Sequence, residues 1–148
     1  MKAERNIIDA ELHRLGSELL GEGMTVRIQA SGYSMFPAIR PGDIIEIEPL
    51  GGDDGAASLI AGEIVALARK DDFVVHRLVG CFLKDGRRWV FTRGDSVLRA
   101  DDPLPVEAVA GRVVKITRGT RVMAPPRTRV NVFYRWNRLI VRILGVIK

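Results

Sequence analysis

The chain contains the three kinds of side chain that serine hydrolases use, namely a hydroxyl, an imidazole and a carboxylate. The candidates are Ser34, His76 and three carboxylates later in the chain, Asp95, Asp101 and Asp102. A serine becomes a nucleophile when a base within hydrogen-bond reach takes its proton. A carboxylate can orient a histidine base and stabilise its charged form. These residue types indicate acyl-transfer chemistry, provided that the fold brings them together.

Ser34 is the candidate nucleophile, in the run Ser31-Gly-Tyr-Ser-Met-Phe-Pro37. Gly32 and Pro37 favour a bend here. Such a bend would expose the hydroxyl and leave backbone N–H groups for an oxyanion hole. In an arbitrary protein, however, a serine in a Gly/Pro loop usually caps a turn. Ser34 alone therefore does not distinguish a nucleophile from a turn residue.

His76 is the candidate base. Within the predicted strand 73–82, alternation over residues 73–80 puts His76 on one face with Val74 and Leu78. A histidine in that setting is usually a core residue with a satisfied ring, but histidine also suits general-base work near neutral pH. The chain has two histidines. The other, His13, lies in a predicted helix, where we expect a solvated side chain.

The three carboxylates lie in one predicted loop. Asp95 lies at a strand end, and Asp101 and Asp102 precede Pro103. Carboxylates in such a loop usually cap turns or stay solvated. One of them can instead orient His76 through its second ring nitrogen.

The elements that must position these residues follow from hydrophobic periodicity. Four apolar residues within 5–20 recur at helical spacing, so we expect an amphipathic helix packed on the body; they are Ile8, Leu12, Leu15 and Leu19. Short β-rich runs follow, separated by turn residues. The predicted strands are residues 25–30, 43–48, 63–69, 73–82, 88–92 and 111–117, with turns at 41–43, 51–55, 84–86 and 94–95. This spacing predicts a mainly β fold, an antiparallel coiled sheet or a barrel-like domain.

The composition fits one globular domain with a helical segment at each end. The chain has 148 residues, of which 47% are hydrophobic and 28% charged, enough to bury a core. Its single cysteine, Cys81, excludes an internal disulfide and a cysteine zinc cluster. We expect no metal or organic cofactor, and neither a signal peptide nor a membrane anchor at the N-terminus. We divide the chain into an N-terminal helix (1–23), a body that carries the candidates (24–118) and a basic tail (119–148).

The tail carries the excess positive charge. The net charge is +5, and residues 127–148 hold six basic residues and no acidic ones. Apolar residues recur there at helical spacing with arginines between them, which is typical of an amphipathic helix on an anionic membrane surface. Docking of this helix on the body or on a partner is the alternative. The apolar runs are too short for a spanning helix and no nucleic-acid-binding motif is present, so we expect a protein that is cytoplasmic or peripheral at the membrane.

Taken in order, the motifs resemble the sequence boxes of type I signal peptidases and their LexA-like relatives. The matching boxes are Ser31-Gly-x-Ser-Met-x-Pro37, Arg40-Pro-Gly-Asp43, Gly62-Glu-Ile-Val65, Val75-His-Arg-Leu-Val79, and Thr92-Arg-Gly-Asp95 with Asp101. The resemblance covers residues 26–116, about three-fifths of the chain. It implies a signal-peptidase-type fold for the body.

The resemblance also implies roles for the candidates. Ser34 would be the nucleophile and His76 the general base. Most bacterial signal peptidases and LexA-like autoproteases have a lysine as base, whereas a histidine resembles the archaeal and endoplasmic-reticulum-type enzymes. The spacing of the paired aspartates favours Asp101 as the acid that orients His76, with Asp95 as a structural partner and Asp102 as an adjacent candidate.

Two departures from the family pattern affect the interpretation. A transmembrane helix usually precedes the serine box and is not found here, and Gly32 stands where many relatives have a serine. The oxyanion hole would therefore rest on main-chain N–H groups, including that of Ser34.

We interpret the chain as a serine endopeptidase that cleaves extended, signal- or leader-peptide-like substrates through an acyl-enzyme. One alternative is a catalytically silent binding or maturation-accessory module of the same fold. Another is a LexA-like self-cleaving regulator, although no Ala-Gly or Cys-Gly bond precedes Ser34.

Overall fold

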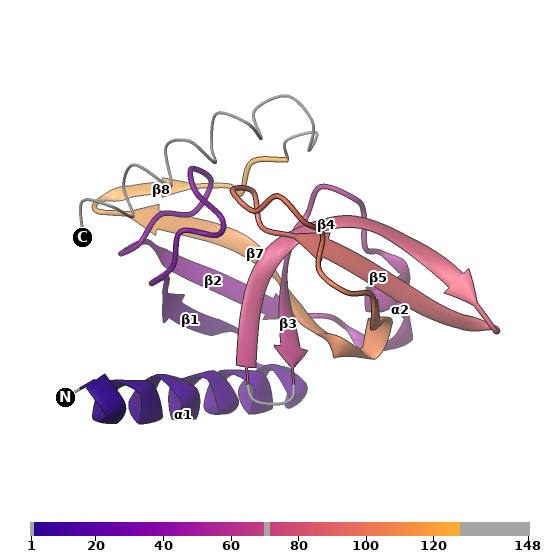
Figure 1. Cartoon of the computed structure of the whole chain (residues 1–148), viewed down its shortest axis with the longest axis horizontal. Coiled ribbons are helices and arrows are strands. Elements are labelled where there is room, and N and C mark those ends of the chain that lie inside the picture. Colours follow the sequence, from indigo (N-terminus) through magenta and orange to yellow (C-terminus); the bar gives the residue numbers. More distant parts are fainter. Residues whose placement is uncertain (1, 70–71, 128–148) are drawn as a thin grey trace.

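The computed structural model of the chain describes residues 2–69 and 72–127 (Figure 1). A long helix comes first, followed by strands with one short helix and one 3-10 turn among them. The elements are α1 (Lys2–Gly21), β1 (Val26–Gln29), β2 (Ile44–Pro49), α2 (Gly52–Ala57), β3 (Ile64–Arg69), β4 (Asp72–Lys84), β5 (Arg87–Arg93), β6 (Leu104–Pro105), η1 (Val106–Ala108), β7 (Val109–Arg118) and β8 (Arg121–Met123). The predicted C-terminal helix lies outside the described residues.

The strands form one curled sheet in the order β1-β2-β7-β3-β4-β5-β6, with β8 added to β7. The strand pairs of the described residues are antiparallel, so the mainly β, antiparallel prediction is confirmed. The register shifts at Glu46/Ile47, Ala66/Leu67 and Leu78/Gly80. Such irregularities increase the local twist of a sheet, and here the sheet is a half-barrel with α1 lying across one end (Figure 1).

Strand β3 lies between two core clusters and explains why its sequence is apolar without interruption. Ile64 and Ala66 belong to the first cluster, which also contains Ile47 and Ile116. The next residues along the strand, Val65 and Leu67, face the second cluster. Successive side chains of a strand point to opposite faces, so β3 is buried on both sides and holds the sheet at its centre.

Residues 51–55, predicted as a turn, begin the short helix α2 instead. The backbone N–H of Gly55 donates to the carbonyl oxygen of Gly51 at 2.6 Å, and that of Ser58 donates to Asp54 at 3.0 Å. Glycine has a low helix propensity, which is why the sequence suggested a turn. A Cβ on Gly55 would lie 2.8 Å from the carbonyl carbon of Leu50, so a glycine there lets the helix pack against the end of β2.

Two further segments differ from the sequence-based expectation. Residues 121–123, assigned to the tail by their position after 118, form β8 and pair with β7. In α1, Leu12 and Leu15 fall on the predicted apolar stripe, but 57% and 47% of their surfaces are exposed. Within residues 11–21, where burial is described, Gly16 and Leu20 are the buried positions.

Candidate active site

Ser34 lies in the loop between β1 and β2, in a tight turn that its neighbours anchor in the core. The N–H of Phe36 donates to the Tyr33 carbonyl at 3.0 Å, and that of Ile39 donates to the Met35 carbonyl at 3.0 Å. Met35 and Ile39 are 4% and 3% exposed. Because these two side chains fill the core, the turn is fixed and Ser34 is left half-buried at its surface.

The loop after β5 supports the Ser34 turn from behind. The backbone N–H of Ser96 donates to the Ser34 carbonyl at 3.0 Å, and its buried hydroxyl donates to the Tyr33 carbonyl at 2.6 Å. A Cβ on Gly94 would lie 2.6 Å from the Ser34 carbonyl oxygen, closer than real Cβ contacts. A glycine is therefore needed where the two loops meet.

His76 lies on β4, opposite Val65 of β3, and its side chain is 10% exposed. Its Nδ1 is 2.6 Å from Oδ2 of Asp101. The Thr92 hydroxyl donates to the same oxygen at 2.7 Å. An ionised carboxylate accepts hydrogen bonds and cannot donate them, so Nδ1 must carry the proton. A neutral ring then has its lone pair on Nε2.

The backbone explains how Asp101 reaches His76 from 25 residues away. Thr92 on β5 pairs with Leu78 on β4, two residues beyond His76. After β5 the chain turns back, and the N–H of Asp101 donates to the Thr92 carbonyl at 2.8 Å. Thr92 therefore fixes Asp101 twice, through its carbonyl and through its hydroxyl.

Asp95 has a different partner. Its two oxygens accept from Nε and Nη2 of Arg77 at 2.7 and 2.6 Å, and the Arg77 side chain is 1% exposed. Nη1 of Arg77 donates to the carbonyl oxygens of Gly62 and Pro126, each at 2.7 Å. Arg77 pairs in register with Arg93 of β5, so Asp95 lies directly beyond its partner strand. Asp102 is exposed.

Ser34 and His76 both line one cavity of about 320 Å³, which we call the Ser34–His76 cavity. Its wall also includes Gly32, Met35 and Phe73. Within the described residues, no hydrogen bond joins the Ser34 hydroxyl to the His76 ring, and no backbone hydrogen bond uses the Ser34 N–H. The cavity therefore has Ser34 and His76 in one wall, and the Ser34 N–H has no backbone acceptor within the described residues.

Asp43 holds the far end of the Ser34 loop. It is 2% exposed, and its oxygens accept from Nε and Nη2 of Arg118 on β7 at 3.0 and 2.8 Å. The Arg40 N–H donates to Oδ2 at 2.8 Å. Burial raises the pKa of Asp43, but the hydrogen bonds from Arg118 and Arg40, with their positive charges, outweigh burial and hold the pKa below its ordinary value. The carboxylate therefore stays ionised and closes the loop.

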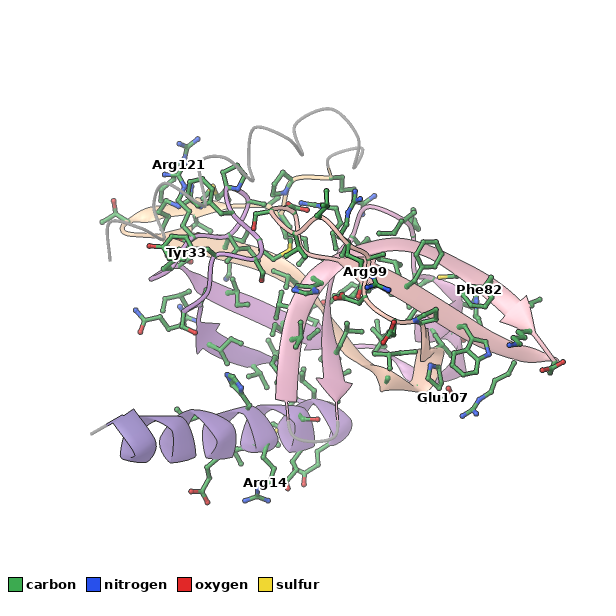
Figure 2. All side chains as sticks on the ribbon, in the orientation of Figure 1. Arg14, Tyr33, Phe82, Arg99, Glu107 and Arg121 are labelled. Carbon is green, nitrogen blue, oxygen red and sulfur yellow. The ribbon has the colours of Figure 1, made fainter. Side chains whose placement is uncertain are left out.

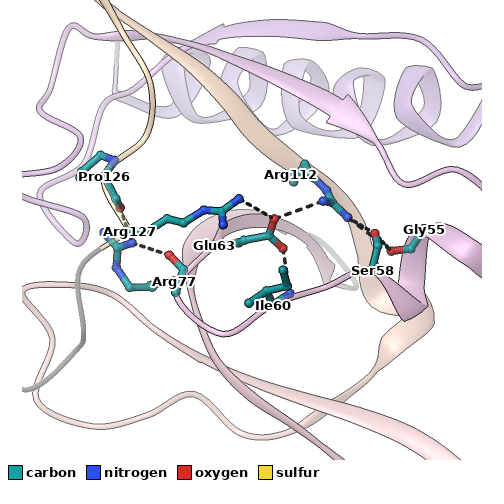
Figure 3. A network of polar contacts seen from close by, with 9 residues as sticks. Gly55, Ser58, Ile60, Glu63, Arg77, Arg112, Pro126 and Arg127 are labelled. Atoms are coloured by element: carbon teal, nitrogen blue, oxygen red, sulfur yellow. Dashed lines mark hydrogen bonds and ion pairs between the residues drawn. The ribbon is translucent and has the colours of Figure 1, made fainter.

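A second polar network anchors the chain after β8 (Figure 3). The Glu63 side chain is 8% exposed, and its Oε1 is 3.1 Å from Nη1 of Arg112 and 3.8 Å from Nη2 of Arg127. The Ile60 N–H donates to its Oε2 at 3.0 Å. Together with the bond from Arg77 to the Pro126 carbonyl, this network attaches the end of the described chain to the start of β3 and to β4.

Several residues at the site carry no clear signal in the sequence. Thr92 and Ser96 read as an ordinary strand residue and an ordinary loop residue, since their roles depend on contacts between distant segments. His13, expected to be solvated, is half-buried on the cavity wall. Its ring centroid is 6.1 Å from that of Phe73. The pairing of a histidine on α1 with an aromatic residue at the start of β4 depends on how α1 crosses the sheet.

The described residues contain no cluster of three or more histidine, cysteine, aspartate or glutamate side chains arranged to hold a metal ion. No helix in the described part of the chain combines the length and apolar character needed to span a membrane. Comparisons with models of known protein families and with curated protein sequences find no match for this chain.

Proposed function

We propose that the chain is a serine endopeptidase of the signal-peptidase superfamily, with Ser34 as nucleophile, His76 as general base and Asp101 as the acid that orients His76. The observation that carries the proposal is the 2.6 Å contact between His76 Nδ1 and Asp101 Oδ2, made beside a cavity that Ser34 also lines. The order of the sequence boxes adds a resemblance that residue types alone do not give.

The reaction would proceed in two halves. The Ser34 oxygen bonds to the peptide carbonyl carbon while His76 Nε2 takes the proton of the Ser34 hydroxyl. Asp101 stabilises the imidazolium that results. The unused N–H of Ser34 is available to the oxyanion. When the C–N bond breaks, the imidazolium gives its proton to the leaving amine. A water molecule, deprotonated by His76, then attacks the acyl carbon and releases Ser34.

The edge of the sheet favours an extended peptide as substrate. Strand β1 is the last strand on its side of the described sheet and leads directly into the Ser34 loop. A peptide can add to such an edge as a further strand, with its main chain supplying the hydrogen bonds. Small side chains next to the cut bond are implied by the family resemblance.

The hydroxyl and the ring do not yet form a hydrogen bond, which is common in substrate-free enzymes, where such contacts tighten in the complex. The same observation favours a second candidate, a catalytically silent binding or maturation-accessory module of the same fold. One experiment separates the two. The intact chain is treated with a fluorophosphonate, which bonds covalently to an activated serine, and the mass of the product is measured.

We expect one adduct on Ser34, no adduct in Ser34→Ala, and labelling slowed by orders of magnitude in His76→Ala. Ser58→Ala is the control, because Ser58 is an exposed serine that does not line the Ser34–His76 cavity, and its loss should leave labelling in place. A folded protein that does not react supports the silent module. An adduct that persists in Ser34→Ala contradicts the choice of nucleophile.

The basic segment 127–148 lies almost entirely outside the described residues. We propose that it binds anionic membrane surfaces through an arginine face and an apolar face. No nucleic acid is expected as a partner.

A further inference from the structure

We propose that a groove between α1 and β1 binds bulky apolar side chains of the same extended peptide, several residues away from the bond that is cut. The inference rests on the proposed function, because it takes the peptide in the Ser34–His76 cavity as its starting point. It adds a specificity element formed by α1, a helix that lies outside every sequence box.

The groove is a second cavity of about 400 Å³, which we call the α1–β1 groove. Its apolar lining comes from one face of α1, from β1 and from the start of β4. The main apolar residues are Leu12, Leu15, Leu19, Val26, Ile28 and Phe73. In Figure 2, Arg14 of the same helix points away from the sheet, so α1 turns a charged face outward and keeps its leucines beside β1.

The groove is open, and its exposed leucines are not explained by the packing of the described chain. Leu12 and Leu15 are 57% and 47% exposed although both line the groove. Two large apolar side chains side by side on a helix face indicate a surface that gains from being covered. Leu12 and Leu15 thus differ from Gly16 and Leu20 of the same helix, which are buried.

Continuity with the Ser34–His76 cavity identifies a peptide as the occupant. The stretch 28–31, His13 and Phe73 line both cavities. His13 and Phe73 therefore stand where one cavity passes into the other, and one chain can lie in both. A ligand that occupies both must be extended, because β1, whose free edge borders the path, is itself extended.

The length of β1 sets where the apolar residue should fall. A strand rises about 3.3 Å per residue, so the five steps from Val26 to Ser31 span about 16 Å. A peptide running beside β1 from Ser34 reaches the groove about five residues from the carbonyl that Ser34 attacks. We therefore expect selectivity for leucine-sized side chains at that distance, on one side of the cut bond.

The test measures binding to the full-length Ser34→Ala protein, so that no hydrolysis is needed. Three fluorescein-labelled peptides with a central alanine run are compared by anisotropy: one with leucines about five residues before the centre, one with leucines about five residues after it, and one with alanines throughout. Burial of one leucine corresponds to at least about a tenfold change in Kd. One leucine peptide should therefore bind tenfold more tightly than the alanine peptide.

The matched variants carry Leu12→Gln and Leu15→Gln together, or Leu83→Gln as control. Leu83 is 76% exposed on β4 and lines neither cavity. All three leucines are exposed, so the melting temperatures of the variants should be close to that of the parent protein. The tenfold preference should vanish in the Leu12/Leu15 variant and persist in the Leu83 variant.

Equal Kd values for all three peptides, or a preference that survives the Leu12/Leu15 substitutions, would overturn the inference. So would a dimer in sedimentation that becomes a monomer in the Leu12/Leu15 variant, since a second copy would then cover the groove. A protein that shows the leucine preference but does not react with the fluorophosphonate supports the groove and contradicts the proposed catalysis.

Discussion

At the scale of single residues, one carboxylate oxygen determines what the candidate histidine can do. Oδ2 of Asp101 accepts a hydrogen bond from the Thr92 hydroxyl and contacts Nδ1 of His76. The Thr92 side chain is 2% exposed and cannot turn to water, so the oxygen is held at one place. The ring is therefore fixed in the orientation and the tautomer that a general base needs.

Asp101→Asn should slow fluorophosphonate labelling of Ser34 by about 10⁴-fold while leaving the fold intact. An asparagine can donate its amide hydrogen to Nδ1, which places the ring proton on Nε2 and removes the base. The measurement is the second-order labelling rate beside a urea unfolding curve. Asp102→Asn is the control, since this exposed neighbour should label at the parental rate.

Asp95→Asn should instead lower the unfolding free energy and change the labelling rate of the folded protein much less than Asp101→Asn does. The reason is that this substitution leaves the Arg77 guanidinium buried without a charged partner. Removal of one member of a buried ion pair costs about 3 kcal/mol or more of unfolding free energy. If Asp95→Asn instead remains stable and slows labelling more than Asp101→Asn does, the roles assigned to the two carboxylates must be exchanged.

At the scale of elements, the Ser34 loop is held by ties at both of its ends. Near β1 the Ala30 N–H donates to the Asp43 carbonyl, and the Gly42 N–H donates to the Ala30 carbonyl, each at 2.8 Å. The Asp43 carboxylate also accepts two hydrogen bonds from Arg118, which connect the loop to β7. A loop closed in this way holds Ser34 at a fixed place although Ser34 itself belongs to no helix or strand.

Asp43→Asn should lower the unfolding free energy by about 2 kcal/mol near neutral pH, because the hydrogen bonds from the half-buried Arg118 would then go to a neutral amide oxygen in place of a buried carboxylate. The folded-state pKa of Asp43 lies below the ordinary value of 3.8. Its stabilisation is therefore complete above that ordinary value and is lost as the pH falls through the lower folded-state pKa. The difference between parent and variant should shrink below about pH 4.

Urea unfolding at a series of pH values tests this expectation, with exposed Asp54→Asn as the control. A difference between parent and Asp43→Asn that stays constant into strong acid would mean that the ionised carboxylate does not stabilise the loop.

The sequence predicted those elements whose signals are local. Alternating or continuous apolar runs with glycine and aspartate at their ends marked the six longer strands, each within a few residues of its observed bounds. The two-residue β6 and the three-residue β8 are too short to show periodicity. The sequence named Asp101 for His76 through a family resemblance. It could not reveal the Thr92 and Ser96 contacts, because these depend on β5 returning beside β4 and the Ser34 loop.

At the scale of the whole molecule, the position of charge separates the body from its tail. Residues 127–148 carry six positive charges, which leaves the first 126 residues near −1. The proposed attraction to an anionic surface therefore rests on residues 127–148, whereas the residues that line the two cavities lie between 12 and 76.

The full chain should bind vesicles that contain phosphatidylserine and bind weakly or not at all to pure phosphatidylcholine vesicles. Each arginine near such a surface contributes about 1 kcal/mol of binding free energy. Added salt should weaken binding, because interactions between exposed charges are screened beyond about 10 Å at 0.1 M ionic strength. Co-sedimentation measures the bound fraction. Replacement of Arg135, Arg138 and Arg142 by glutamine should abolish it.

The control replaces three exposed arginines outside residues 127–148 by glutamine, namely Arg14, Arg87 and Arg121, and should leave vesicle binding unchanged. A chain shortened after Arg127 should stay folded and react with fluorophosphonate at the parental rate. If the shortened chain unfolds, the tail is part of the core and the membrane proposal fails.

The hydrogen bond from Arg77 to the Pro126 carbonyl fixes the place on the described chain from which residues 127–148 continue. Arg77 follows His76 directly in β4, so this attachment lies close to the candidate site. Arg127 adds a second attachment at Glu63. If residues 127–148 bind a bilayer as proposed, the described part of the chain would be attached to that surface at one fixed point, beside the start of β3 and β4. If the chain also cleaves peptides as proposed, the Ser34–His76 cavity would then select bonds by their distance from the membrane surface, and closer or more distant bonds would stay uncut.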